Sequence, residues 1–467
     1  MDVSDILTDL NAAQRDAVAA ESGNLLVLAG AGSGKTRVLV HRMAWLIRAE
    51  GVSPHALLSV TFTNKAAREM RSRIESMLDV STQGMWVGTF HGLAHRLLKQ
   101  HWQEAQLPQN FQILDSDDQL RLVKRVCRDL NLDEAQWPPR QAQWYINGQK
   151  DEGLRAAHIQ EGGDPYLATM LRIYREYEAT CERLGVIDFA ELLLRALELW
   201  KNKPEVLDHY QQRFQHILVD EFQDTNSLQM KLLQQLVGEP YNICVVGDDD
   251  QSIYGWRGAQ VANILQFERF FRNPKIIRLE ENYRSTQAVL EVANSLIRHN
   301  VGRREKKLRP TIPGGDLVRL VSMPGDQEES EWIVSEIVMQ REEGRVLEDF
   351  AILFRTNGQI RKMEEVLREE KIPYRMVGAQ SFYDRKEVRD VLSYVQVLNQ
   401  PELDIPLLRI LNTPPRGIGN TTSMAALDWS REKDQSIWET LIDGDFLVQV
   451  SKKVRNSIQT FTSQVEE

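Results

Sequence analysis

Short apolar runs, each followed at once by glycine or polar residues, recur along the chain. The first covers residues 24–29, Asn-Leu-Leu-Val-Leu-Ala, and runs into a glycine-rich turn. Similar runs lie at 57–62, 216–219, 243–246 and 276–279. Apolar runs bounded by turn residues are typical of buried strands, and polar residues at their carboxyl ends are typical of an open parallel α/β sheet with its ligand crevice there. The pattern therefore predicts an α/β fold.

Between about 91 and 214 the apolar residues instead recur at three- and four-residue spacing, as on one face of a helix. The spacing is clearest in 117–130, 165–184 and 188–200, and no alternating strand pattern interrupts it. We therefore predict a helical domain inserted into the sheet. A further helix is expected at 35–49, directly after the glycine-rich turn.

A second α/β unit is predicted from about residue 281, with 350–354 as a strand, and the pattern turns helical again near Gly378. A chain of 467 residues is too long for one core. The predicted organisation is a first α/β domain at 1–90 and 215–280, the insertion at 91–214, the start of a second α/β domain at 281–377, and a partial helical domain at 378–467.

Composition excludes some classes without assigning a function. Hydrophobic residues make up 42% and charged residues 27%, as in soluble globular proteins. No apolar stretch approaches the roughly 20 residues that span a bilayer, and the acidic start lacks the order of a signal peptide. Three scattered cysteines suggest neither a disulfide framework nor a zinc site. A cytosolic protein with no membrane association is expected.

Net charge is −10, which argues against DNA binding over the whole surface but does not exclude a basic groove. A run of charges at 303–307, Arg-Arg-Glu-Lys-Lys, is interpreted as a solvated surface.

The clearest chemical motif follows the first predicted strand, in Ala29-Gly30-Ala31-Gly32-Ser33-Gly34-Lys35-Thr36. Glycines let the backbone curl so that successive N–H groups face phosphate oxygens, and the following helix adds partial positive charge. Lys35 would reach the β- and γ-phosphates, and the Thr36 hydroxyl would bind Mg²⁺. Ala29 replaces the first glycine of this P-loop pattern, and a glycine-rich turn without a ligand is the alternative.

An acidic pair completes the chemistry that hydrolysis requires. Asp220 and Glu221 follow the predicted strand at 216–219. Asp220 would hold Mg²⁺ through water, and Glu221 would orient or deprotonate the attacking water. Such a pair alone is weak support, but together with the phosphate loop it predicts binding of ATP and Mg²⁺.

Five segments in chain order resemble superfamily 1 helicases of the UvrD/Rep/PcrA group, closest to UvrD. They are Val60-Thr61-Phe62-Thr63-Asn64-Lys65-Ala66-Ala67, Val87-Gly88-Thr89-Phe90-His91-Gly92, Asp220-Glu221-Phe222-Gln223-Asp224-Thr225-Asn226, Val246-Gly247-Asp248-Asp249-Asp250-Gln251-Ser252-Ile253-Tyr254-Gly255-Trp256-Arg257-Gly258-Ala259 and Leu279-Glu280-Glu281-Asn282-Tyr283-Arg284-Ser285-Thr286. The resemblance implies two RecA-like domains and an ATP-dependent 3′–5′ helicase acting on single-stranded DNA and duplex junctions, with DNA repair proteins as partners.

The resemblance also implies roles at the nucleotide. Gln14 matches the residue that reads the adenine edge, and Arg37 and Tyr283 match residues that sandwich the base, a use that suits a cation and an aromatic ring. Arg284 matches an arginine that reaches the γ-phosphate from the second motor domain. Gln251 matches a γ-phosphate sensor linked to the DNA groove.

For DNA, the resemblance implies stacking and backbone contacts. Stacking on aromatic rings is tolerant of sequence and worth ~1–3 kcal/mol per base. The implied DNA contacts are Phe62, Thr63, Asn64, Thr89, His91, Phe189, Tyr254, Trp256 and Arg257, with Thr61 beside them. Phe90 and Phe222 are equally compatible with the core, and Phe189 lies in an amphipathic stretch where either placement is open.

Two later segments resemble the helical accessory domain. The turn containing Gly417 and Gly419 matches a hairpin that grips duplex phosphates through backbone N–H groups, although such turns are common. Residues 378–387 match the opening of that domain less closely.

Two later motifs of the family, resembling Ser-Ala-Lys-Gly-Leu-Glu and Val-Thr-Arg-Ala, are not found before Glu467. The second motor domain and the accessory domain are therefore expected to be incomplete. ATP binding is expected to persist more readily than turnover, with unwinding weak or absent. The alternatives are a non-hydrolysing ATP- and DNA-binding remnant and, less favoured, the motor part of a helicase–nuclease.

Overall fold

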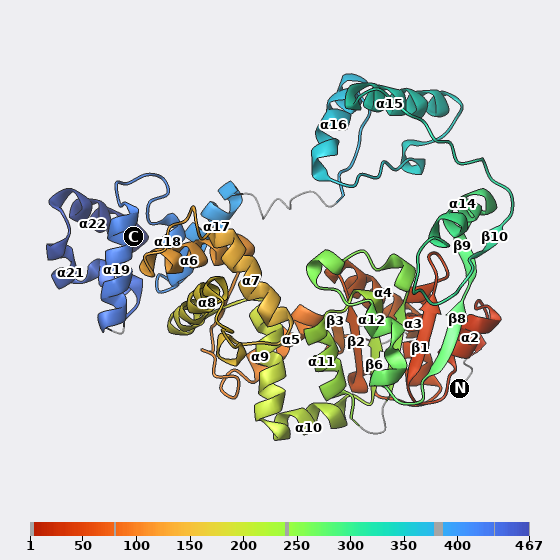
Figure 1. The fold of residues 1–467 in the computed structure, drawn as a ribbon, viewed down its shortest axis with the longest axis horizontal. Helices are drawn as coiled ribbons and strands as arrows, with labels where there is room; N and C mark the ends of the chain where they lie inside the picture. The colour runs from red at the N-terminus through yellow and green to blue at the C-terminus, as the bar shows by residue number, and fades with distance from the viewer. Residues whose placement is uncertain (1–3, 79–80, 239–241, 378–385, 434, 467) are drawn as a thin grey trace. The chain divides into compact units, whose positions relative to one another are not determined.

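The computed structural model describes residues 4–78, 81–238, 242–377, 386–433 and 435–466. The chain divides into two compact units, Met1–Val318 and Arg319–Glu467. Each unit is described by itself below, with the elements labelled as in Figure 1.

A six-stranded parallel sheet forms the centre of the first unit (Figure 1), in the order β3-β2-β6-β7-β1-β8. Its strands are β1 (Leu25–Ala29), β2 (Leu57–Thr61), β3 (Trp86–Thr89), β6 (His216–Val219), β7 (Ile243–Gly247) and β8 (Lys275–Leu279). The five strands predicted from apolar runs are confirmed, and β3 is an additional edge strand. The predicted α/β class is confirmed as well.

Both faces of the sheet are buried, because helices cover each of them. Neighbouring residues of a strand point to opposite faces. Leu25 and Val27 pack on the face covered by α1 (Ser4–Leu7), α2 (Ala12–Val18), α3 (Lys35–Arg48) and α4 (Asn64–Leu78). Leu26 and Leu28 pack on the face covered by α5 (Phe90–Gln100), α9 (Phe189–Asn202), α10 (Pro204–Arg213), α11 (Ser227–Leu236), α12 (Ala262–Leu265) and α13 (Phe267–Phe270). Full burial of such a side chain contributes about 1.5–3 kcal/mol, so the strands are anchored from both sides.

The stretch between β3 and β6 is mostly helical, with α6 (Ser116–Asp129), α7 (Pro139–Asp151) and α8 (Pro165–Leu184) between α5 and α9. The helices expected at 117–130, 165–184 and 188–200 are confirmed. The expectation of no strands was wrong in one place, because β4 (Gln112–Leu114) pairs with β5 (Val186–Asp188) in parallel. Three residues are too few to produce a recognisable alternation.

Beyond β8 the chain continues directly into β9 (Glu281–Thr286), α14 (Gln287–Ile297) and β10 (Arg309–Ile312). β9 and β10 form a parallel two-stranded ladder. The backbone N–H of Tyr283 in β9 donates to Gly32 O at 3.0 Å, so this ladder lies against the glycine-rich turn.

The second unit contains α15 (Asp326–Glu342) and α16 (Ile360–Glu369), which share a small core around Val334 and Val366. It continues with α17 (Lys386–Asn399), α18 (Asp404–Ile410), α19 (Asn420–Lys433), α20 (Ile437–Ile442), α21 (Gly444–Gln449) and α22 (Lys452–Glu466). Across the described ranges, no helix is both long and apolar enough to cross a bilayer.

The strand predicted at 350–354 is wrong. These residues form no strand, and Leu353 is exposed. A strand requires a neighbour to accept and donate its backbone hydrogen bonds, and among the described residues no strand pairs with this segment. The apolar run alone did not supply that information.

Candidate nucleotide site and adjoining groove

The loops of the candidate site gather at the carboxyl edge of the sheet. Strand β7 lies between β6 and β1, so the loops after these three strands are adjacent although they are far apart in sequence. The loops after β2 and β3 follow along the same edge, next to β6. Parallel α/β sheets place ligands at this edge. Two neighbouring sites result, one beside β1 and the other beside β2 and β3.

The glycine-rich turn after β1 requires glycine at two positions. Gly32 and Gly34 have φ of 68° and 88°, values that side chains rarely adopt. A Cβ on Gly32 would lie 2.5 Å from Asn282 Nδ2, and one on Gly34 would lie 2.8 Å from Gln14 Nε2. The turn ends at Gly34, the N-cap of α3, so the helix N-terminus faces the site.

Lys35 contacts two side chains from other loops of the site, Glu221 and Gln251. Its Nζ donates to Glu221 Oε2 at 2.9 Å and to Gln251 Oε1 at 3.3 Å. Glu221 has a φ of 48°, an uncommon backbone conformation for a residue other than glycine. Such conformations cluster at functional sites, where the surrounding structure maintains them. The side chains of Lys35, Glu221 and Gln251, which follow β1, β6 and β7, therefore converge.

Thr36 and Asp220 form a candidate Mg²⁺ site. Thr36 Oγ1 donates to Asp220 Oδ2 at 3.4 Å. Burial, and next the charge of Glu221, raise the pKa of Asp220 to about 6, so a cation there would favour its ionised form. A hydroxyl and a carboxylate are hard oxygen ligands, and Mg²⁺ is usually held by one or two carboxylates together with substrate phosphates. The donor set therefore fits Mg²⁺ with a nucleotide.

The residues expected around adenine lie near the turn. Gln14 is buried, and its Nε2 donates to Ser33 O at 2.9 Å. Arg37 is partly exposed, with its NH2 3.8 Å from Asp9 Oδ2. The Tyr283 hydroxyl accepts from Asn11 Nδ2 at 2.7 Å and donates to Glu281.

Arg284 follows Tyr283 and is exposed beside the turn. A Cβ built on Gly32 would lie 2.7 Å from Arg284 Cβ, so the backbone of β9 passes close to the phosphate loop.

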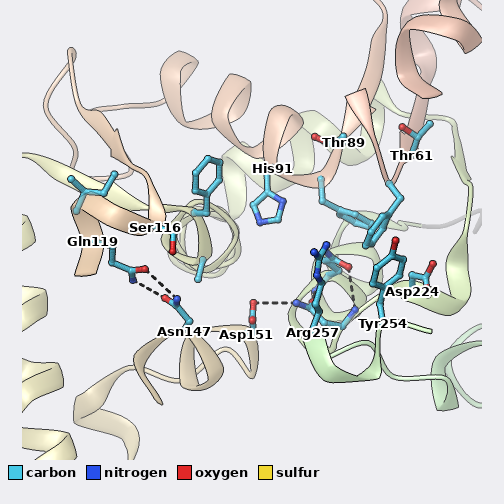
Figure 2. A pocket seen from close by; sticks show the side chains of 17 residues that line it. Thr61, Thr89, His91, Ser116, Gln119, Asn147, Asp151, Asp224, Tyr254 and Arg257 are labelled. Atoms are coloured by element: carbon cyan, nitrogen blue, oxygen red, sulfur yellow. Dashed lines mark hydrogen bonds between the residues drawn. The ribbon is translucent and has the colours of Figure 1, made fainter. Parts of the chain in front are cut away.

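A groove of about 400 Å³ lies at the carboxyl ends of β2 and β3 (Figure 2). One wall comes from the loops after β2, β3, β6 and β7, and the other from the inserted helices. Its lining residues are Thr61, Phe62, Thr89, Phe90, His91, Leu114, Ser116, Gln119, Asn147, Asp151, Phe189, Ala190, Asp224, Asn226, Gln229, Tyr254 and Arg257. Six of the nine DNA contacts implied in this part of the chain are among them.

Aromatic rings are arranged in pairs along the groove. Phe62 stacks on Tyr254 with ring centroids 5.3 Å apart and an interplanar angle of 24°. His91 meets the ring of Phe189 edge-on at 6.1 Å. Phe189 is 52% exposed, so it faces the groove rather than the core. Phe222, by contrast, is fully buried in the core.

Three implied DNA residues lie outside the groove lining. Trp256 is 69% exposed, and the guanidinium carbon of Arg257 lies 4.5 Å from its ring centroid, so Trp256 borders the groove that Arg257 lines. Thr63 and Asn64 are exposed at the start of α4, where Thr63 Oγ1 accepts from Ala66 N. Thr89 Oγ1 likewise caps α5 by accepting from Gly92 N.

The second unit carries the remaining candidates. Gly417 and Gly419 are exposed in the turn between α18 and α19, and Gly417 has a φ of 77°. Most of the segment expected to open the accessory domain, 378–385, lies outside the described residues.

Several groove residues were not found by sequence reasoning. Gln119 of α6 and Asn147 of α7 exchange hydrogen bonds at 2.7 and 3.2 Å, and Asp151 Oδ1 accepts from Asn226 Nδ2 at 3.1 Å (Figure 2). Among these, only Asn226 lay in a recognised segment. The others are single polar residues on amphipathic helices, where nothing in the pattern distinguishes them from solvent-facing positions.

Titratable groups of the groove depart from their ordinary behaviour. Burial raises the pKa of Asp151 to about 6, with the nearby Asp188 carboxylate adding to the effect. Burial followed by the charge of Glu221 also raises the pKa of Asp224 to about 6. Burial lowers the pKa of His91. The carboxylates of Asp151 and Asp224 therefore become protonated on mild acidification from neutral pH.

The sheet, the glycine-rich turn and the converging Lys35, Thr36, Asp220 and Glu221 define the P-loop class of α/β proteins. Residues 10–272 match the family described as UvrD/REP helicase N-terminal domain, and residues 277–450 match the UvrD-like helicase C-terminal domain. The chain belongs to the UvrD/REP helicase family.

Individual relatives agree with this assignment. The chain is 53% identical over 439 residues to DNA helicase II of Escherichia coli (strain K12), covering 94% of this chain and 61% of that protein. It is 50% identical over 445 residues to DNA helicase II of Haemophilus influenzae, with 94% and 61% covered. It is 39% identical over 462 residues to ATP-dependent DNA helicase PcrA of Staphylococcus epidermidis (strain RP62A), with 99% and 63% covered. The chain thus spans about three fifths of these relatives' length.

Proposed function

We propose that the chain is the ATP-binding part of a motor that moves 3′–5′ along single-stranded DNA and separates strands at duplex junctions. The observation that carries the proposal is the convergence of Lys35 with Glu221 and Gln251 at 2.9 and 3.3 Å, beside a groove lined by stacked aromatic rings. Relatives named DNA helicase II and ATP-dependent DNA helicase PcrA support it.

At the nucleotide, Lys35 and the N-terminus of α3 would bind the phosphates, and Glu221 would orient the attacking water and accept its proton. Mg²⁺ held by Thr36 and Asp220 would neutralise charge on the β- and γ-phosphates. Gln14, Arg37 and Tyr283 would hold adenine. Arg284 would contribute a second cation at the γ-phosphate, where a planar guanidinium suits the charge of the transition state.

At the groove, bases would stack on Phe62, Phe189 and Tyr254, with His91 and Arg257 beside them. Thr89 and, at the border, Thr63 and Asn64 would contact the DNA backbone. Trp256 extends the stacking surface, and Gly417 and Gly419 would contact duplex phosphates. Stacking without base-edge selection suits an enzyme that moves along any sequence.

The proposed domain organisation is the one predicted from the sequence. Residues 1–90 and 215–280 form the ATP-binding domain, 91–214 the inserted domain, 281–377 part of the second RecA-like domain, and 378–467 part of the accessory domain. Cytosolic location is supported by three free, buried cysteines. A role in DNA repair, with repair proteins as partners, rests on the family resemblance.

A strand-displacement assay tests the proposal, with partial duplexes carrying 3′ or 5′ tails and with the wild-type chain and Lys35→Ala. Weak, Lys35-dependent displacement from 3′ tails is the expected result. Displacement from 5′ tails alone contradicts the polarity. ATP and single-strand binding without phosphate release or displacement contradicts the motor and selects a binding protein.

A further inference from the structure

The charge run at 303–307 is solvated only in part: Glu305 and Lys307 are exposed, but Lys306 is buried, contrary to the sequence-based interpretation. The side chain of Lys306 is 3% exposed. Its Nζ lies 2.8 Å from Asp248 Oδ1, 2.5 Å from Asp249 Oδ1 and 2.9 Å from Asp250 Oδ2. One ammonium group therefore pairs with all three carboxylates of the segment Asp248–Asp250, here called the acidic turn.

Neighbours of Lys306 reinforce this attachment. Arg303 donates to both carboxylate oxygens of Asp250, from Nε at 2.7 Å and from NH2 at 2.5 Å. The backbone N–H of Arg304 donates to Asp249 Oδ2 at 2.8 Å. Burial by itself would lower the pKa of Lys306, but the carboxylates hold it above its ordinary value. The loop between α14 and β10 is thus fixed to the loop after β7.

The acidic turn adjoins both halves of the candidate site. Gln251, the next residue, donates from Nε2 to Asp248 Oδ2 at 2.6 Å and accepts from Lys35 Nζ at 3.3 Å. Three residues further on, Tyr254 stacks on Phe62 in the groove. A displacement of the acidic turn would therefore move the contact to Lys35 and the stacking ring together.

Three adjacent carboxylates repel one another, and burying them requires a paired cation. Lys306 supplies that cation from the segment that also carries β9 and Arg284. We propose that Lys306 is a positioning residue that sets the acidic turn and thereby couples nucleotide binding at Lys35 to single-stranded DNA binding at Tyr254. The coupling rests on the proposed function, because its two ligands are the nucleotide and single-stranded DNA. The attachment of the acidic turn to Lys306 does not depend on that function.

The first test measures the attachment itself. Hydrogen exchange is followed in the full chain for wild type, Lys306→Met and the matched control Lys307→Met, whose native side chain is exposed. The amides of Asp250 and Gln251 are expected to exchange at least tenfold faster in Lys306→Met and unchanged in Lys307→Met, while β1 and α3 stay protected. Unchanged exchange of these amides in Lys306→Met overturns the proposal. If Lys306→Met does not fold, Arg303→Gln replaces it, with a smaller increase expected.

The second test measures coupling. The affinity for a short oligothymidylate is determined with and without a non-hydrolysable ATP analogue and Mg²⁺, because coupling appears as the ratio of the two affinities. Lys306→Met is expected to bring this ratio close to 1. The affinity for the oligothymidylate alone and the affinity for the ATP analogue alone are each expected to change no more than threefold. Loss of both affinities with the ratio preserved indicates a merely structural residue and overturns the coupling. A wild-type chain that binds neither ligand overturns the proposed function, and hydrogen exchange then decides the attachment alone.

Discussion

Lys35 Nζ donates to Glu221 Oε2 at 2.9 Å although 186 residues separate the two in the chain. The contact exists because β6 and β1 flank β7 in one parallel sheet, so their carboxyl ends face the same crevice. The ammonium that would bind phosphate is therefore held by the carboxylate that would activate water. A bound γ-phosphate would have to take Lys35 from Glu221, which would free that carboxylate for the water.

Glu221→Gln should separate nucleotide binding from turnover. The amide keeps the size of the side chain but accepts no proton, so single-turnover phosphate release stimulated by single-stranded DNA should fall about 10²- to 10⁴-fold. Affinity for a fluorescent ATP analogue should stay equal or rise, because the negative charge that competes for Lys35 is gone. The control is Glu205→Gln, at an exposed position of α10. Turnover within threefold of wild type would exclude Glu221 as the base.

The sequence predicted the sheet well, because strand burial and the residues of the phosphate loop are local properties. Apolar runs marked five of its six strands, and motif order joined Lys35 to Glu221 across the helical insertion. It did not predict the short strand pair β4 and β5, and it wrongly predicted a strand at 350–354. Whether an extended segment becomes a strand depends on a partner that the segment does not encode.

The site shows the same limit. Phe62 and Tyr254 were recognised because they lie in segments resembling a family. Lys306 was wrongly assigned to a solvated surface. A run of charges does not indicate which of its cations will pair with three carboxylates elsewhere in the chain. Gln119 and Asn147 were missed, since burial of a polar residue depends on how helices pack.

Tyr254→Ala should weaken single-stranded DNA binding without changing the affinity for the nucleotide. Its ring stacks on Phe62 at 5.3 Å and lines the groove, so its removal should cost about 1–3 kcal/mol, or roughly 5- to 150-fold in affinity. Fluorescence anisotropy with a labelled oligothymidylate measures the change. Phe270→Ala, a partly exposed ring outside the groove lining, should bind as wild type does. Equal affinities for Tyr254→Ala and wild type would place the DNA elsewhere.

Single-strand affinity should rise as pH falls from 7.5 to 5.5. Burial raises the pKa of Asp151 to about 6, so acidification through that value removes a negative charge from the groove and relieves its repulsion of phosphates. Asp224 titrates in the same direction. His91 also gains positive charge on acidification, but at lower pH than an ordinary histidine, because burial lowers its pKa.

Asp151→Asn isolates the first contribution. At pH 7.5 the variant should bind single-stranded DNA about fivefold more tightly than wild type, corresponding to about 1 kcal/mol for one screened charge. Its pH dependence should be shallower, because only Asp224 and His91 remain. Binding titrations at matched ionic strength measure both effects, with the exposed Asp208→Asn as control. A pH dependence identical to that of wild type would contradict the assignment to Asp151.

The inserted helices contain a buried ion cluster whose loss should destabilise the fold. Lys150 Nζ lies 2.6 Å from Asp188 Oδ2 and 2.9 Å from Glu191 Oε2, with all three side chains at most 4% exposed. Lys150→Met should cost about 3–5 kcal/mol at pH 7.5, because it leaves buried carboxylates without that cation. The urea midpoint of the helical signal measures the loss, and Lys201→Met at an exposed position of α9 serves as control.

The pH dependence of that loss tests its electrostatic origin. Burial alone would raise the pKa of Glu191, but Lys150 and Arg155 hold it below its ordinary value, so wild-type stability from this group is present at neutral pH and lost on acidification. In Lys150→Met, Glu191 loses the ammonium that lowers its pKa, so its pKa rises and its protonation relieves the burial cost. The difference between wild type and variant should therefore be smaller at pH 5 than at pH 7.5. A penalty that stays constant over this range would mean that Lys150 stabilises the helices by packing rather than by charge.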